Sequence, residues 1–297
     1  MTAGRVTIAG GRFAAAIDPL GAELASLRVD AAREILWQGD PAFWAGRAPL
    51  LFPVVGRSPG GMARWRGASF TMPPHGVARQ SRFAVIEARP DAARFELRDS
   101  DTTRAHYPFA FRLVVAYRLD DAGMTMTASA ENLSRDTPMP AALGFHPGFA
   151  WPLVEDAAKT DHALVFEAPE PAGIRRIDAS GLMRHQPLPT PVRGRRLDLH
   201  DGLFADDAVI FDRLTSRRVW FGVPGRPGLR VDFPDCPHLG VWMRPGAPYL
   251  CIEPWQGFAP EIGDDGDLAR RPGTILLPPG GALTRSLRIA LDDVPPA

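Results

Sequence analysis

The sequence predicts an antiparallel all-β protein, and three observations carry this prediction. Apolar and polar residues alternate with a period of two wherever the chain is regular, which is typical of strands with one buried face. Glycine (29) and proline (31) together make about a fifth of the 297 residues, so turns are frequent and long helices are few. No amphipathic segment keeps helical spacing over more than about three turns. A chain of this length needs large sheets packed face to face, which favours a sandwich over a small barrel.

The expected strands follow one another along the chain. Residues 94–98 alternate between polar and apolar side chains, and residues 229–233 and 287–291 do the same. In residues 113–119 every second side chain is apolar, and a similar pattern resumes after a tight turn in residues 124–131. These last two segments therefore predict a hairpin of two long strands.

We predict a single domain that covers residues 1–297, because no low-complexity linker divides the chain. The proline-rich segment from Ala168 to Arg196 interrupts the strand pattern. We interpret it as a long surface excursion of the same domain, since the sequence on either side of it looks alike.

The composition is that of an ordinary folded protein that does not bind nucleic acid. Lys and Arg together number 34, and Asp and Glu together number 34, so the basic excess of a nucleic-acid-binding protein is lacking. An apolar content of 45% with a net charge of zero excludes a disordered chain.

Neither a secretion signal nor a membrane span is expected. Residues 1–11 lack the apolar core and the cleavage site of a signal peptide. Residues 137–154 carry no Asp, Glu, Lys or Arg, but they hold four prolines and a histidine, which a spanning helix does not accommodate easily. Cys236 and Cys251 have no metal-binding or redox spacing, and a disulfide between them is left open. We therefore expect a cytoplasmic protein with no membrane partner.

Four segments break the alternation and gather polar or ionisable residues. They are residues 51–57, which end in Arg57; residues 72–79, which hold His75 and Arg79; residues 143–149, around His146; and residues 249–255, around Glu253. The first three also have ordinary explanations, as a strand end, a turn histidine and a satisfied core histidine. A carboxylate that ends an apolar run, as in the fourth, must be hydrogen-bonded, paired or functional.

Together the four segments supply side chains that an all-β fold can bring into one cleft. His75 lies between proline and glycine, on a stiff loop suited to present its side chain to a ligand. His146 lies among aromatic residues and prolines, as either a core residue or a desolvated acid–base group. No phosphate-binding loop or dinucleotide fingerprint occurs, and no histidine pair has metal-binding spacing. We therefore expect neither a cofactor nor a metal.

At these residues the sequence resembles the aldose 1-epimerase (galactose mutarotase-like) family, essentially over the whole chain and in order. The motifs that carry the resemblance are residues 20–24 and 36–40, Leu51-Phe52-Pro53 through Gly56-Arg57, His75-Gly76 with Arg79, Phe145-His146-Pro147-Gly148-Phe149, and Cys251-Ile252-Glu253-Pro254-Trp255. The Glu-Pro-Trp form looks like that of a less-characterised bacterial branch. Gly56 stands where members known for galactose or glucose tend to have Asn, which leaves the identity of the sugar open.

The resemblance implies an antiparallel β-supersandwich and a cofactor-free interconversion of the α and β anomers of a hexose or a hexose derivative. It implies that Glu253 is the general base and that His146 is the general acid. The residues that it places at the sugar in addition are His75, Arg57, Arg79 and Asp207. Asp206 is adjacent to Asp207, and the sequence does not decide which of the two faces the site.

This chemistry removes a proton from the anomeric hydroxyl and delivers one to the ring oxygen. A glutamate is ready as a base at neutral pH, whereas a histidine that acts as an acid must hold its proton. We expect a nearby carboxylate, Asp207 or Glu253, to raise the pKa of His146. Four tryptophans are candidates for stacking on the sugar, and we expect most of them to be core residues: Trp37, Trp44, Trp242 and Trp255.

Three alternatives remain open at the level of function. Arg57 and Arg79 are also suited to grip an anionic sugar such as a hexose 6-phosphate. A non-catalytic sugar-binding protein is the second alternative. A glycosidase that uses Glu253 with Asp207 is the third and least favoured, because it gives His146 no role. We expect a small-molecule sugar as the partner, no nucleic acid, and a monomer or a homodimer.

Overall fold

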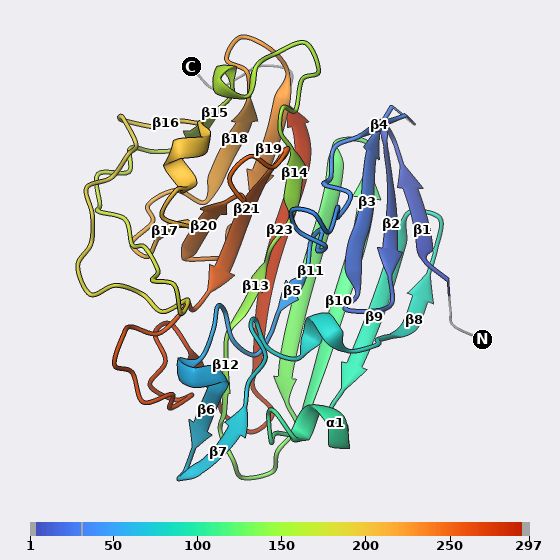
Figure 1. Cartoon of the computed structure of the whole chain (residues 1–297). Helices are drawn as coiled ribbons and strands as arrows, with labels where there is room; N and C mark the ends of the chain where they lie inside the picture. Colours follow the sequence, from blue (N-terminus) through green and yellow to red (C-terminus); the bar gives the residue numbers. More distant parts are fainter. Residues whose placement is uncertain (1–3, 31, 293–297) are drawn as a thin grey trace.

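The largest element of the structure is a nine-stranded antiparallel sheet (Figure 1). The computed structural model describes residues 4–30 and 32–292, so the first three residues of the N-terminal stretch considered above lie outside the described residues. In order across the sheet the strands are β16 (Arg196–Asp198), β15 (Ala163–Phe166), β18 (Arg218–Gly222), β19 (Gly228–Asp232), β23 (Ala282–Asp292), β11 (Gly123–Asn132), β10 (Phe111–Asp120), β9 (Ala92–Arg98) and β8 (Ala84–Ala88).

The hairpin of β10 and β11 lies next to β23 in the middle of this sheet and confirms the two long strands expected from the sequence. Buried positions alternate with less buried ones along both strands, as the period of two requires. Asp120 closes the turn, because its Oδ1 accepts hydrogen bonds from the N–H groups of Ala122 at 2.9 Å and Gly123 at 3.0 Å.

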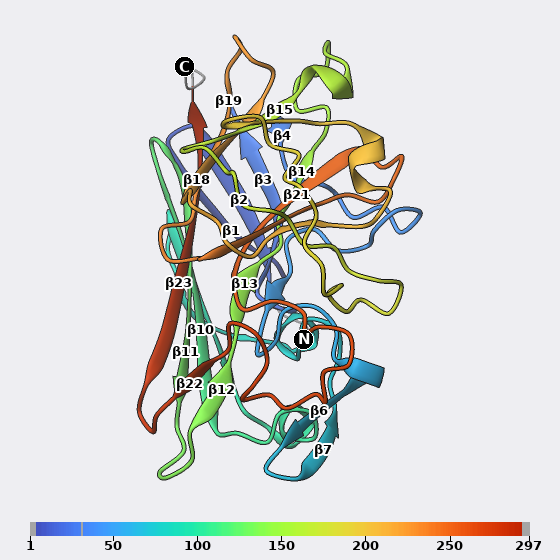
Figure 2. The ribbon, with the colours of Figure 1, turned by 90° about the vertical axis from the view of Figure 1, so that its left-hand side faces the viewer.

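Two smaller antiparallel sheets form a second layer over the large one (Figure 2). The four-stranded sheet consists of β1 (Val6–Gly10), β2 (Phe13–Asp18), β3 (Glu23–Val29) and β4 (Arg33–Glu34). The six-stranded sheet consists of β17 (Val209–Phe211), β20 (His238–Trp242), β21 (Tyr249–Gln256), β13 (Leu143–Phe145) and β5 (Leu50–Leu51), with β14 (Gly148–Ala150) paired to β21. Strands β1 and β2 contact β10, whereas β13 and β21 contact β23, so each small sheet covers a different part of the large one.

The core between the layers consists of apolar and aromatic side chains from both. Phe52, which follows β5, packs against Phe111 of β10 at a ring-centroid distance of 5.2 Å. The hydroxyl of the fully buried Tyr117 donates a hydrogen bond to the carbonyl oxygen of Ala22 at 2.6 Å and so links the large sheet to the chain just before β3. The antiparallel all-β sandwich expected from the sequence is confirmed.

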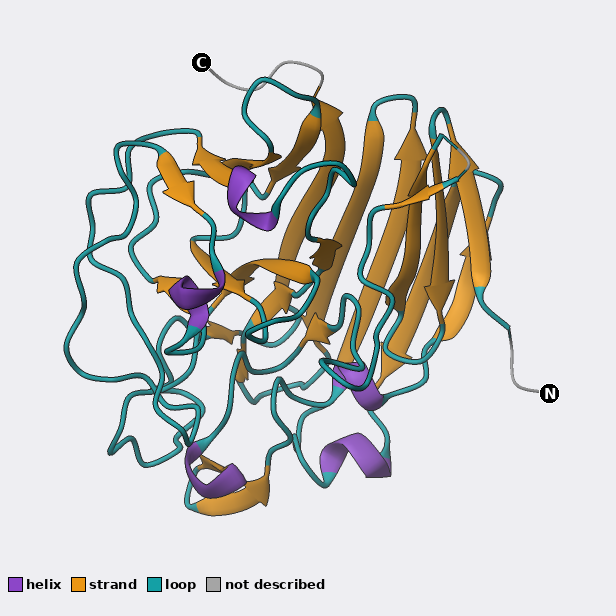
Figure 3. Cartoon of the chain, turned by 45° about the horizontal axis from the view of Figure 1, so that its top comes forward, coloured by secondary structure: helices purple, strands orange, loops and turns teal. Residues whose placement is uncertain are grey.

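The remaining elements are short and lie at the edges (Figure 3). They are the hairpin of β6 (Met62–Trp65) and β7 (Ala68–Thr71), the pair β12 (Met139–Ala141) and β22 (Ile275–Leu277), the one-turn helix α1 (Asp101–Arg104), and the 3-10 turns Pro59–Gly61, Ala78–Gln80, Lys159–Asp161 and Asp201–Phe204. No helix in the described part of the chain is long and apolar enough to cross a membrane.

Candidate functional site

A cavity of about 220 Å³ opens where the loops around the six-stranded sheet converge. All four segments that the sequence analysis singled out contribute to its wall. The expected site residues that line it are Arg57, His75, Arg79, His146, Asp207 and Glu253. Side chains that are far apart in the sequence therefore meet in one place, as the resemblance implied.

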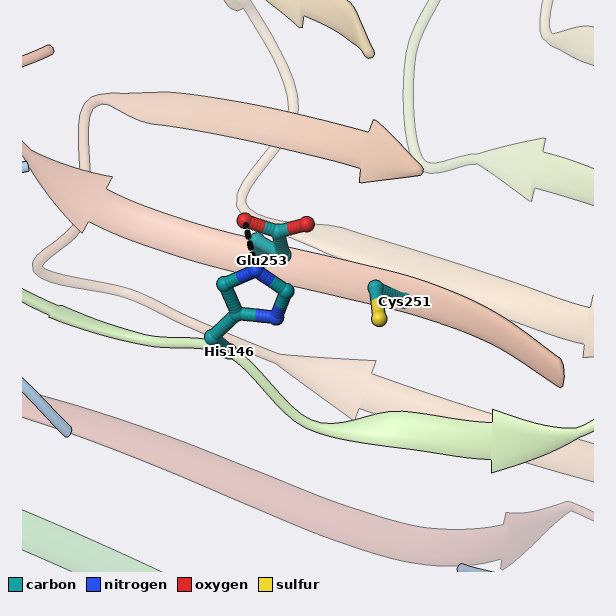
Figure 4. A group of neighbouring side chains, drawn as sticks. All are labelled: His146, Cys251 and Glu253. Atoms are coloured by element: carbon teal, nitrogen blue, oxygen red, sulfur yellow. Dashed lines mark ion pairs between the residues drawn. The ribbon is translucent and has the colours of Figure 1, made fainter. Parts of the chain in front are cut away.

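Strand register places His146 directly opposite Glu253. The chain pairs with β21 before this point, where Gly144 faces Trp255, and again after it, where Gly148 faces Cys251. Between these two stretches Pro147 and Pro254 have no N–H to donate, so the hydrogen-bond ladder is interrupted. One backbone hydrogen bond still crosses this stretch, from the N–H of Ile252 to the carbonyl oxygen of Pro147 at 3.2 Å. The register puts the two side chains on the same face, with His146 Nε2 at 3.2 Å from Glu253 Oε2 (Figure 4).

Burial controls the protonation of this pair. His146 is 7% exposed and Glu253 is 3% exposed. Burial, and secondarily the charge of Asp207, raises the pKa of Glu253 well above its ordinary value. Burial, together with His75 and Arg79, lowers the pKa of His146 well below its ordinary value. Both shifts favour the uncharged forms, which are a protonated Glu253 carboxyl and a neutral His146 ring.

This result corrects one expectation from the sequence. We expected a neighbouring carboxylate to raise the pKa of His146, and Glu253 is indeed in contact with it. The pKa is lowered nevertheless, because desolvation of the imidazolium is the largest effect on this group.

Aromatic side chains fix the ring of His146. Trp44 stacks on it at a centroid distance of 4.9 Å, and Trp242 meets it edge-on at 5.9 Å. Both tryptophans are half-buried and line the cavity, which leaves a face for a ligand. Trp37 and Trp255 are buried as expected, although Trp255 also reaches the cavity wall.

The loop that carries His75 is tied to the loop that carries Gly56. The N–H of Gly56 donates to His75 Nδ1 at 3.2 Å, and the N–H of His75 donates to the carbonyl oxygen of Gly56 at 2.9 Å. Because a backbone N–H only donates, Nδ1 must be unprotonated, and the ring hydrogen lies on Nε2. Burial and the guanidinium groups of Arg79, Arg271 and Arg57 lower the pKa of His75 to about 3, so the ring is neutral.

Two arginines bring positive charge to the cavity. Arg57 is exposed and Arg79 is half-buried. Within residues 4–30 and 32–292, neither guanidinium lies within ion-pair distance of a carboxylate. Burial lowers the pKa of Arg79, and the charge of Glu23 partly opposes this. Both arginines are therefore available to a polar or anionic ligand.

The structure also decides between the two neighbouring aspartates. Asp207 lines the cavity, with a φ of 64° and its Oδ1 accepting a hydrogen bond from the N–H of Ala208 at 2.7 Å. The side chain of Asp206 is 61% exposed and lies 3.5 Å from Arg184 Nη2, outside this cavity. Of the two aspartates, Asp207 is therefore the one on the wall of this cavity.

Sequence reasoning missed one wall of the cavity. The segment from Ala168 to Arg196 is more than a surface excursion, because Ile177 and Gly181 within it line the site. Single β-bridges hold the segment in place, from Arg175 to Ile210 and from Met183 to Glu261. Gly181 approaches Arg57 closely, since a Cβ atom at Gly181 would lie 2.5 Å from Arg57 Cδ.

Cys251 is the third group near the acid–base pair, and it offers a ligand set for a metal. One atom each of His146, Cys251 and Glu253 lie within 4.8 Å of one another (Figure 4). Nitrogen, sulfur and oxygen donors of this kind suit Zn²⁺. Burial raises the pKa of the Cys251 thiol well above its ordinary value, however, and His146 and Glu253 already contact each other. Both cysteines are free, which closes the question of a disulfide.

Comparison with known proteins decides the family. Residues 4–289 match the family model described as aldose 1-epimerase, a range that includes every residue of the cavity wall. The chain belongs to the aldose 1-epimerase family.

Individual relatives agree with this membership. Protein LacX of Lactococcus lactis subsp. lactis is 32% identical over 262 residues, which are 85% of this chain and 88% of LacX. A galactose mutarotase-like protein from Lactobacillus casei ATCC 334 has a TM-score of 0.90 at 30% identity, covering 97% of this chain and 100% of that one. A galactose mutarotase related enzyme from Lactobacillus acidophilus has a TM-score of 0.87 at 29% identity, covering 98% and 100%.

A glycine substitution tests how this member of the aldose 1-epimerase family holds the His75 loop. Gly76 has a φ of +80°, and a Cβ atom there would lie 2.2 Å from the carbonyl oxygen of Phe52. We expect Gly76→Ala to destabilise the protein by more than the roughly 1–2 kcal/mol of a left-handed alanine, because backbone must also move. The measurement is urea unfolding.

The matched control is Gly60→Ala, since Gly60 has a φ of +56° and no heavy atom within 4 Å of its added Cβ. This variant should show only the cost of the left-handed conformation. Equal losses of stability in the two variants would contradict the close approach of Gly76 to Phe52.

Proposed function

We propose that the protein is an aldose 1-epimerase, an isomerase that interconverts the α and β anomers of a free hexose or a close derivative in carbohydrate metabolism. One observation carries this proposal: a buried carboxyl and a buried imidazole in contact face a cavity of about 220 Å³ in a member of this family. Mutarotation requires one proton acceptor and one proton donor at the same sugar.

In the proposed reaction the proton of Glu253 first passes to His146 Nε2 across their 3.2 Å contact. The Glu253 carboxylate then accepts the proton of the anomeric hydroxyl, and the His146 imidazolium delivers its proton from Nε2 to the ring oxygen. The ring opens to the aldehyde, rotation about the C1–C2 bond exposes its other face, and closure reverses both transfers. The pair ends with the single proton it began with, so each turnover regenerates the starting state. Because the site is buried, the transfers are shielded from bulk water.

The other groups of the cavity supply the binding. Trp44 and Trp242 present aromatic surface to the C–H face of a sugar ring. His75 carries its hydrogen on Nε2 and is a donor to a hydroxyl, and Asp207 is an acceptor. Arg57 and Arg79 donate to oxygen atoms at the same site.

The neighbour of Glu253 also favours this proposal over a glycosidase. A glycosidase of the usual kind needs two carboxyl groups that flank the scissile bond. The group in contact with Glu253 is an imidazole, and Asp207 acts on it only through its charge. A non-catalytic sugar-binding protein would have no need for a desolvated acid–base pair, which is costly to bury.

A second candidate is a mutarotase for an anionic sugar, such as a hexose 6-phosphate. The observation that favours it is the accumulation of positive charge around His75, whose pKa is lowered by burial and then by three guanidinium groups. Two of these, on Arg57 and Arg79, line the cavity. Guanidinium groups bind phosphate and carboxylate with paired hydrogen bonds.

Substitution of the acid–base pair tests the proposed activity. We expect Glu253→Gln and His146→Asn each to lower kcat by about 10²- to 10⁴-fold, because each removes one positioned proton-transfer group. The measurement is anomer exchange by NMR on glucose, galactose and their 6-phosphates. Folding is checked by the near-UV circular dichroism of the two variants. If the wild-type protein binds these sugars without exchanging their anomers, the proposal fails in favour of a binding protein.

The pH profile tests the electrostatics of the pair. The raised pKa of Glu253 and the lowered pKa of His146 predict a broad plateau of kcat/KM, after subtraction of the uncatalysed rate. Rate falls at high pH, where the pair loses its last proton. Asp207→Asn removes a negative charge that raises the pKa of Glu253, so the alkaline limb should move to lower pH.

Asp206→Asn is the control for this experiment, because Asp206 pairs with Arg184 and does not line the cavity. Its profile should match that of the wild-type protein. An alkaline limb that moves upward in Asp207→Asn would be incompatible with the assigned effect of its charge.

Arg57 separates the two candidate substrate classes. If the substrate is anionic, Arg57→Gln should raise KM for a hexose 6-phosphate by roughly tenfold or more and raise KM for the neutral hexose much less. Arg184→Gln is the control, because this arginine pairs with Asp206 and does not line the cavity. Equal effects of Arg57→Gln on both sugars would favour the neutral hexose.

A further inference from the structure

Arg271 lies outside the cavity but reaches the loop that carries Arg57. It belongs to the connection of residues 257–274 between β21 and β22 and is only 5% exposed. Its Nη1 donates to Ser58 Oγ at 3.0 Å, and its Nη2 donates to the carbonyl oxygen of Arg57 at 2.9 Å and to that of Val55.

The guanidinium is buried without a carboxylate in ion-pair distance among the described residues, and Asp264 acts on it only through space. Burial lowers its pKa to about 10, so the group stays charged at neutral pH. A buried charge without a counter-ion is costly, and hydrogen bonds to carbonyl oxygens are what offset the cost here. An apolar residue at position 271 could not make these hydrogen bonds to Val55, Arg57 and Ser58.

The two carbonyl oxygens that Arg271 holds belong to the residues on either side of Gly56. Gly56 in turn donates its N–H to His75 Nδ1 and accepts from the N–H of His75. A chain of hydrogen bonds therefore runs from Arg271, through residues 55–58, to the ring of His75. The last bond in this chain determines which nitrogen of His75 carries the hydrogen.

The backbone next to Arg271 is hydrogen-bonded to the end of β21, the strand that carries Glu253. Gln256, the last residue of β21, donates from Nε2 to the carbonyl oxygen of Gly273 at 2.6 Å. The N–H of Phe258 donates to the carbonyl oxygen of Pro272 at 3.3 Å. These two hydrogen bonds tie the residues that follow Arg271 to the end of β21. Glu253 lies on the same strand, three residues before Gln256.

We propose that Arg271 is a positioning residue for the binding half of the site: it sets the loop of residues 55–58, and through Gly56 it holds His75 in the tautomer with the hydrogen on Nε2. Arg271 touches no ligand in the cavity itself. Its effect on sugar binding rests on the proposed function, whereas its effect on His75 does not.

The test compares Arg271→Met with Arg270→Met. Arg270 is the adjacent arginine, is 67% exposed at its side chain, and contacts Asp265 and Asp267 at the surface. The first readout is ¹⁵N NMR of the His75 ring, which needs no activity. We expect an unprotonated Nδ1 in the wild-type protein and in Arg270→Met, and hydrogen shared between both nitrogens in Arg271→Met.

The second readout is kinetic. In Arg271→Met we expect KM for the sugar to rise about tenfold or more while kcat changes little, because His146 and Glu253 are not displaced. If Arg271 had only a structural role, its substitution would lower stability without raising KM selectively and without changing the tautomer of His75. If the His75 signal changes and no activity exists in any variant, the inference stands and the proposed function fails.

Arg271→Lys provides the second variant. A lysine ammonium cannot donate to Ser58 and to both carbonyl oxygens in the same fork geometry, so we expect an intermediate rise in KM and a partial change at His75. It decides the outcome if Arg271→Met does not fold. An unprotonated Nδ1 and a wild-type KM in a folded variant at position 271 would overturn the proposal.

Discussion

The 3.2 Å contact between His146 Nε2 and Glu253 Oε2 depends on the register between β21 and the segment that joins β13 to β14. The two residues occupy opposing positions on neighbouring strands, where cross-strand side chains lie close. Pro147 and Pro254 remove two donors from that stretch, yet the pairing resumes on either side. The sheet therefore brings together the carboxyl and the imidazole of the proposed acid–base pair from two distant segments of the chain.

The proposed acid–base pair lies in the sheet region, whereas the proposed binding residues lie on the surrounding loops. In the proposed proton-transfer pair Glu253 lies on β21, and His146 lies between β13 and β14, which both pair with β21. The proposed binding residues lie on loops. Gly56 and Gly76 have positive φ angles there, and the loops are held by the hydrogen bonds between Gly56 and His75 and by the buried guanidinium of Arg271. Changes in sugar preference can therefore arise on the loops without disturbing the pair.

The sequence predicted the fold well because strand periodicity is a local signal, as in β9, β10, β11 and β23. The site residues came from polar groups in apolar surroundings and from the family resemblance. The sequence could not predict that His146 and Glu253 face each other, because the register between distant strands is a property of the folded chain. Gly181 and Ile177 carry no chemical signal, and Arg271 looks like any surface arginine. The pKa of His146 was expected to rise because sequence does not report burial.

The measurement that tests the central claim most directly is a pH titration of the pair by NMR, with ¹³C on the Glu253 carboxyl and ¹⁵N on the His146 ring. It does not depend on knowing the sugar. The account predicts that the pair holds one proton across the neutral range, with no ordinary titration of either group. A Glu253 carboxyl that titrates near about 4.3 together with a His146 ring that titrates near about 6.5 would show two independent, solvated groups and contradict the account.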